Sequence, residues 1–124
     1  MSAQFQLNQI GQIAINVHDV DRATAFYRDT LGMRYLFTAG ELAFFDCGGI
    51  RLMLAKPEKP ELDHPASILY YKVSDIQKAY EALSTRKVKV EEAPILVARL
   101  EKADLWLSSF RDSEGNLLAL MSEV

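Results

Sequence analysis

The stretch VHDVDRA at residues 17–23 recurs as VSDIQKA at residues 73–79. In each copy a valine ends an alternating apolar run, and an aspartate stands where a helix would begin. A second pattern, D-x-x-G-x-x-L-x-L, occurs at residues 46–54 and again at residues 112–120. Two copies of one unit predict a pseudo-symmetric fold, with a site built from equivalent positions of both halves.

The first half reads as one strand, one helix and three strands. Apolar and polar residues alternate from Ile10 to Val17, which predicts a strand. Asp19 can cap the next helix, because apolar residues then recur at helical spacing up to Leu31. Gly32 suits the helix end, since glycine adopts the left-handed conformation cheaply. Strands are expected at 33–38, 42–46 and 50–55.

The second half repeats this order after a linker. Segment 56–66 holds three of the four prolines among charged residues. A strand is expected at 67–73 and a helix at about 75–85, where Ser74 and Gln77 have the spacing of a capping box. Further strands are expected at 87–97 (broken near Pro94), 105–111 and 116–121. We therefore predict a single α+β domain over 1–124, with βαβββ modules at about 8–55 and 67–123.

Composition limits the function classes. The net charge is -3, with 25% charged and 49% hydrophobic residues, as in soluble globular proteins. No basic cluster indicates a nucleic-acid partner, and no apolar run approaches the roughly 20 residues of a membrane span. The first residues lack the features of a secretory signal, and the single cysteine, Cys47, excludes an internal disulfide. We expect a cytoplasmic protein without membrane or nucleic-acid partners.

Two motifs resemble a known family. Residues 17–32 read V-x-D-x-x-x-A-x-x-F-Y-x-x-x-L-G, and residues 110–116 read F-x-D-x-x-G-N. They resemble the vicinal oxygen chelate superfamily of glyoxalases, bleomycin resistance proteins and extradiol dioxygenases. The resemblance implies paired βαβββ modules that curl into a cup-like mixed β-sheet, with helices on the outer face. It does not fix the reaction, because members isomerise, epimerise, cleave rings, transfer thiols to antibiotics or only bind a drug.

Most enzymes of this family bind a divalent metal through His, Glu or Gln near the start of each module's first strand and on its last strand. The resemblance places these positions at Gln12, Met53, Ile68 and Ala119. Only Gln12 offers a suitable donor, because a thioether is a weak ligand for such ions and Ile and Ala offer nothing. We therefore expect no metal and no cofactor.

The strand phase that faces away from the helices should line the cup. It supplies mostly apolar groups and a few polar ones, as is common in small-molecule sites. Arg51, Lys72 and Tyr70 are able to meet an anionic or phenolic ligand, although the two cations also suit strand ends in water. The predicted ligand-binding residues are Gln12, Asn16, Arg51, Met53, Ile68, Tyr70, Lys72 and Ala119.

Other reactive side chains have structural interpretations. His18 and His64 fall in expected loops, and Cys47 has no evident base beside it to activate the thiol. The Asp112–Asn116 stretch is explained by turn geometry, since Asp bonds its local backbone and Gly and Asn tolerate positive φ. Alternation leaves open whether Trp106 and Phe110 wall the cup or belong to the core.

Three functions remain open from the sequence. The first is a metal-independent, glyoxalase-like or bleomycin-resistance-like protein that binds a small, largely apolar organic molecule in its cup. The second is a metal-dependent lyase, isomerase or dioxygenase of the glyoxalase type. The third is a dimeric structural or interaction protein with a filled cup and no ligand. Curled sheets leave edges that a second chain can cover, so we expect a homodimer.

Overall fold

The computed structural model describes residues 5–124, which form two successive βαβββ units. The elements of the first unit are β1 (Gln12–Asn16), α1 (Val20–Ala25), β2 (Arg34–Ala39), β3 (Leu42–Cys47) and β4 (Ile50–Ala55). Those of the second are β5 (Leu69–Lys72), α2 (Ile76–Thr85), β6 (Val90–Arg99), β7 (Asp104–Arg111) and β8 (Leu117–Glu123). Helix α1 continues into a π-helical turn at Phe26–Thr30, and the linker contains a 3-10 turn at Pro60–Leu62.

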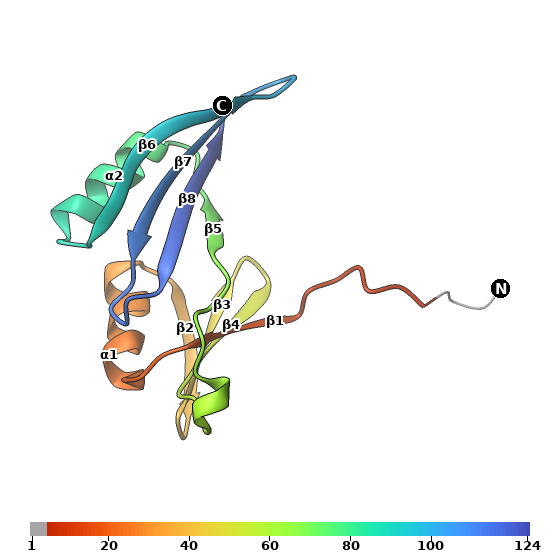
Figure 1. Ribbon diagram of the computed structural model, residues 1–124, viewed down its shortest axis with the longest axis vertical. Coiled ribbons are helices and arrows are strands. Elements are labelled where there is room, and N and C mark those ends of the chain that lie inside the picture. Colours follow the sequence, from red (N-terminus) through yellow and green to blue (C-terminus); the bar gives the residue numbers. More distant parts are fainter. Residues whose placement is uncertain (1–4) are drawn as a thin grey trace.

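Each unit forms one four-stranded mixed sheet. The strand orders are β1-β4-β3-β2 and β5-β8-β7-β6. The first strand of each unit pairs in parallel with its last strand, and all other neighbours are antiparallel. The sheets curl without closing, and α1 and α2 lie on the same side of them (Figure 1). The predicted α+β fold with outer helices is confirmed.

An aspartate caps the N-terminus of each helix. The side chain of Asp19 accepts a hydrogen bond from the backbone N–H of Arg22, and that of Asp75 accepts one from Lys78. The capping box predicted at Ser74 is therefore wrong by one residue. The repeat itself pointed to Asp75, because this residue aligns with Asp19. An aspartate at this position satisfies an N–H group that the first helical turn leaves free.

The region after α2 differs from its predicted strand. Lys87 has a φ of 62°, which is left-handed backbone and incompatible with a strand. Strand β6 consequently begins at Val90 instead of residue 87. Its pairing with β7 shifts register between Glu92 and Ile95, around Pro94, which lacks the N–H needed for regular pairing. The strand nevertheless continues through Pro94 to Arg99.

A single hydrophobic core connects the two units on the helix side of the sheets. Tyr27 and Phe45 from the first unit and Leu118 from the second are almost fully buried in it. Phe110 is 2% exposed and Trp106 packs against the same cluster, which settles both as core residues. No helix within residues 5–124 is long and apolar enough to cross a membrane.

Candidate functional site

The side of each sheet that faces away from the helices is called the cup face below. On β1 and β4 it carries Gln12, Arg51 and Met53, which alternate with the buried residues Ile15, Leu52 and Leu54. The parallel register aligns Gln12 with Arg51. Arg51 Nε donates to Gln12 Oε1 at 2.7 Å, and Gln12 Nε2 lies 3.7 Å from Met53 Sδ. The structure thus brings three predicted site residues into direct contact.

An aromatic pair adjoins this cluster. The Arg51 guanidinium carbon lies 5.3 Å from the centroid of the Phe44 ring, within the range of a cation–π contact. The rings of Phe44 and Phe37 stack with centroids 4.6 Å apart. Neither ring was among the predicted site residues. This part of the cup face therefore combines an aromatic surface with one cation.

The second unit contributes a more apolar surface. Tyr70 and Ala119 are partners in the parallel register of β5 and β8. Tyr70 and Ile68 are exposed, whereas Ala119 is only 4% exposed. Lys72 Nζ lies 3.8 Å from a carboxylate oxygen of Glu123, and both side chains are more than one-third exposed. Lys72 thus has a carboxylate neighbour, and such exposed pairs contribute little to stability.

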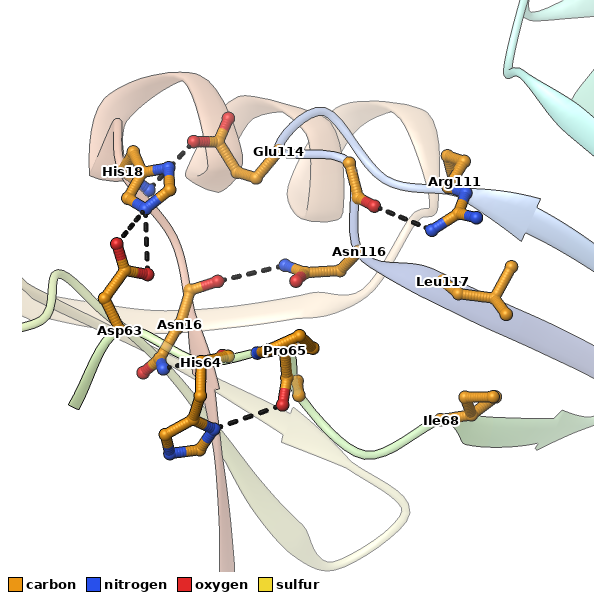
Figure 2. A pocket seen from close by; sticks show the side chains of 12 residues that line it. Asn16, His18, Asp63, His64, Pro65, Ile68, Arg111, Glu114, Asn116 and Leu117 are labelled. Carbon is orange, nitrogen blue, oxygen red and sulfur yellow. Dashed lines mark hydrogen bonds and ion pairs between the residues drawn. The ribbon is translucent and has the colours of Figure 1, made fainter. Parts of the chain in front are cut away.

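A pocket of about 500 Å³ lies between the end of β1, the linker and the β7–β8 turn (Figure 2). Of the eight predicted residues, Asn16 and Ile68 line it. Asn16 Nδ2 donates to the backbone oxygens of Leu62 at 2.7 Å and His64 at 3.1 Å. These two bonds fix the linker against β1 and so shape one wall of the pocket.

Both histidines line this pocket, which their sequence positions did not indicate. His18 Nε2 lies 3.0 Å from each carboxylate oxygen of Asp63. His64 Nδ1 lies 3.1 Å from the carbonyl oxygen of Pro65 and must donate to it, because a carbonyl only accepts. Both histidines lie in loops, as predicted, and both are exposed.

Arg111 in the same pocket is engaged internally. Its Nε donates to Glu91 at 3.0 Å, and its Nη1 donates to the carbonyl oxygen of Gly115 at 3.0 Å. The charge of Arg111 is therefore balanced by the Glu91 carboxylate.

The β7–β8 turn joins the two units through Glu114. Its side chain is 1% exposed. It accepts hydrogen bonds from the backbone N–H groups of His18 at 3.0 Å and Asp19 at 2.9 Å, and from Arg22 Nε at 2.7 Å. Burial would raise the pKa of Glu114, but the bonds from Arg22 and the two backbone groups outweigh it and lower this pKa to about 2. Glu114 is thus an ionised carboxylate at the start of α1.

Asp112 makes a second connection between the units. Its Oδ1 accepts from the backbone N–H groups of Glu114 and Asn116, each at 2.8 Å, which confirms the predicted turn role. Its Oδ2 accepts from the buried Tyr27 hydroxyl at 2.7 Å. Burial and the neighbouring Asp112 carboxylate raise the pKa of Tyr27, so this phenol stays protonated and remains a donor.

Cys47 ends β3 and is partly buried. Burial raises the pKa of its thiol, and the adjacent Asp46 carboxylate raises it further. Because the thiolate is the nucleophilic form, these surroundings do not activate Cys47. This agrees with its interpretation as a spectator.

Comparison with known proteins identifies the family. The sequence profile described as the Glyoxalase/Bleomycin resistance protein/Dioxygenase superfamily matches residues 9–120. The chain belongs to this superfamily. A Bacillus subtilis (strain 168) relative, "Uncharacterized protein YraH", is 29% identical over 123 residues, covering 88% of this chain and 94% of the relative.

Solved structures of this superfamily share the fold. A lactoylglutathione lyase from Agrobacterium tumefaciens has a TM-score of 0.73 at 22% identity, covering 94% of this chain and 95% of that one. A superfamily member from Sphaerobacter thermophilus has a TM-score of 0.77 at 22% identity, covering 94% and 98%. At these identities the likeness establishes the fold and not a shared reaction.

The four positions at which the resemblance predicts metal ligands are Gln12, Met53, Ile68 and Ala119. In the first unit, Met53 pairs with Ala14, and Gln12 lies two residues before Ala14. In the second unit, Ala119 pairs with Tyr70, and Ile68 lies two residues before Tyr70. The register therefore makes the two pairs of positions equivalent. Only Gln12 supplies an oxygen, and this oxygen accepts from the Arg51 cation at 2.7 Å. Within residues 5–124, no group of three or more His, Cys, Asp or Glu residues is arranged to hold a metal.

Proposed function

We propose that this superfamily member works without a metal and binds a small, largely apolar organic molecule on its cup face. The observation that carries the proposal is the bond between Arg51 and Gln12. It places a permanent cation against the one oxygen donor at the four ligand positions, where it would repel a divalent ion. The other three positions hold Met53, Ile68 and Ala119, which are apolar side chains.

The surroundings of Arg51 support an organic ligand. Its guanidinium is exposed and lies over Phe44, which stacks on the half-exposed Phe37. Met53 is partly exposed beside it, and methionine adapts to irregular apolar and aromatic partners. Small-molecule sites commonly combine apolar and aromatic walls with a few polar groups that fix orientation. An apolar ligand with one acidic or polar group matches this combination.

Native mass spectrometry of protein purified from its own host tests the proposal. We expect a small organic molecule to be retained by the wild-type protein and lost from Ala14→Phe, because Ala14 is exposed on the cup face beside Met53. Ser84→Phe is the matched control, since this exposed serine lies on α2 on the other side of the sheet. Retention in Ala14→Phe, or no retained molecule in any variant, would contradict ligand binding on the cup face.

Elemental analysis of the same samples tests metal independence. We expect no stoichiometric zinc, nickel, iron or manganese in the wild-type protein or in Gln12→Ala. About one metal ion per chain in the wild type, lost on Gln12→Ala, would instead favour a metal-dependent lyase, isomerase or dioxygenase. A metal-free protein without any ligand would leave a structural or interaction role as the better interpretation.

A further inference from the structure

A second apolar site lies on the helix side of the sheets, away from the cup face. It is a crevice of about 230 Å³ between the end of the first unit's helical segment and α2. Its walls are mainly apolar and come from both units, including Leu31, Met33, Val73, Ala79, Ala82 and Leu83. This volume is below the roughly 300–1,000 Å³ of sites for drug-sized ligands, so it suits a smaller molecule.

The guanidinium of Arg86 lines this crevice. Arg86 follows the last residue of α2, and its Nη1 donates to the backbone oxygen of Thr30 in the other unit at 2.8 Å. Within residues 5–124, Arg86 makes no ion pair with a carboxylate. Asp29, which precedes Thr30 in the chain, is bound by Arg28 at 2.8 Å. The remaining N–H groups of Arg86 are therefore available to an external anion.

We propose that this crevice binds a small carboxylic acid with an apolar tail or ring. The carboxylate would accept hydrogen bonds from Arg86, whose planar guanidinium matches the two oxygens. The apolar part would occupy the space between Leu31 and α2 and remove both surfaces from water. A neutral or cationic molecule of the same shape would lack the interaction with Arg86 and would bind more weakly.

3-Phenylpropionate is a suitable probe, because it joins one carboxylate to one small ring. Titration followed by backbone amide NMR shifts should give changes grouped at residues 30–33 and along α2. The matched probes 3-phenylpropan-1-ol and 3-phenylpropylamine should bind with an affinity at least about tenfold lower. Equal affinity for the acid and the alcohol, no shifts at millimolar acid, or shifts confined to β1 and β4 would overturn the proposal.

Variants separate this crevice from the cup face. Arg86→Gln should weaken binding of 3-phenylpropionate about tenfold, to the level of the alcohol. Ala82→Phe should abolish binding by filling the crevice from an exposed position on α2, and it keeps the test decisive if loss of the Thr30 contact unfolds Arg86→Gln. Arg51→Gln should leave the affinity unchanged. Weakening by Arg51→Gln together with no effect of Ala82→Phe would assign the probe to the cup face and refute the crevice.

Discussion

The Glu114 carboxylate offers a sharp test of how the two units are joined. In Glu114→Gln the remaining carbonyl oxygen can still accept from His18 and Asp19, as Oε1 does now. The new amide group, however, would face the N–H of Arg22, where Oε2 now accepts at 2.7 Å. The substitution therefore removes the charge and the Arg22 bond while it preserves most of the side-chain shape.

The pKa of Glu114 sets the expected loss of stability in Glu114→Gln. It falls from an ordinary value of 4.5 to about 2 in the folded protein. A shift of this size corresponds to about 3 kcal/mol of stabilisation of the ionised form. Because the folded-state pKa is the lower one, this stabilisation is fully present above pH 4.5 and is lost as the pH falls towards 2. We expect Glu114→Gln to lower the free energy of unfolding by about 2–3 kcal/mol at pH 7.

Urea unfolding followed by the fluorescence of Trp106, the only tryptophan, measures this loss. The difference between wild type and Glu114→Gln should shrink by more than half at pH 3. Asp29→Asn is the matched control, because Asp29 also pairs with an arginine but is 62% exposed, so its loss should leave the free energy of unfolding almost unchanged. A loss below about 0.5 kcal/mol for Glu114→Gln at pH 7, or a loss independent of pH, would contradict a stabilising role of the Glu114 charge.

Three further predictions concern the core, the cup face and the assembly. Tyr27→Phe should lower the free energy of unfolding by about 1.5–3 kcal/mol, because a buried carboxylate loses a hydrogen bond; an effect below about 0.5 kcal/mol in urea unfolding would contradict this. Ala119→Phe should lower the free energy of unfolding by about 1–3 kcal/mol, since Ala119 is almost fully buried. Ala14→Phe, at an exposed position, should melt near the wild type. Equal melting temperatures of the two variants would contradict this contrast. The edge strands β2 and β6 expose the apolar side chains of Leu36, Phe37, Leu96 and Val97, which a second chain can cover. Light scattering should therefore give a homodimer of twice the 14.0 kDa chain mass. A monomer at micromolar concentration would contradict this.

The repeat predicted most of the fold because each copy combines local signals that agree. Alternation indicated β1, and β4 begins and ends at its predicted residues 50 and 55. The helix caps follow from Asp19 and Asp75, and the one error at Ser74 came from treating the second copy without its partner. The start of strand β6 was predicted less well, because Lys87 adopts a left-handed conformation that no local sequence pattern indicated.

The cup face could be predicted only in part. Alternation placed Gln12 and Met53 on one side of the sheet, and the register confirms that their positions match Ile68 and Ala119. The stacking of Phe37 on Phe44 could not be predicted from alternation. It depends on a register shift in β2 between Tyr35 and Phe37, and such a shift moves a side chain to the opposite face.

The connection between the units was not predictable from either copy alone, because it depends on how the copies differ. In the repeat, Asp112 is equivalent to Asp46, and Tyr27 is equivalent to Leu83. Tyr27 reaches Asp112 and forms a buried hydrogen bond, whereas Leu83 has no polar group to offer Asp46, which remains partly exposed.

One junction between the units is therefore held by polar contacts through Asp112 and Glu114. At the other, Leu83 lines the apolar crevice beside Arg86. A symmetric fold with an asymmetric sequence thus produces one polar and one apolar junction. The apolar junction is the one at which we propose a second ligand site.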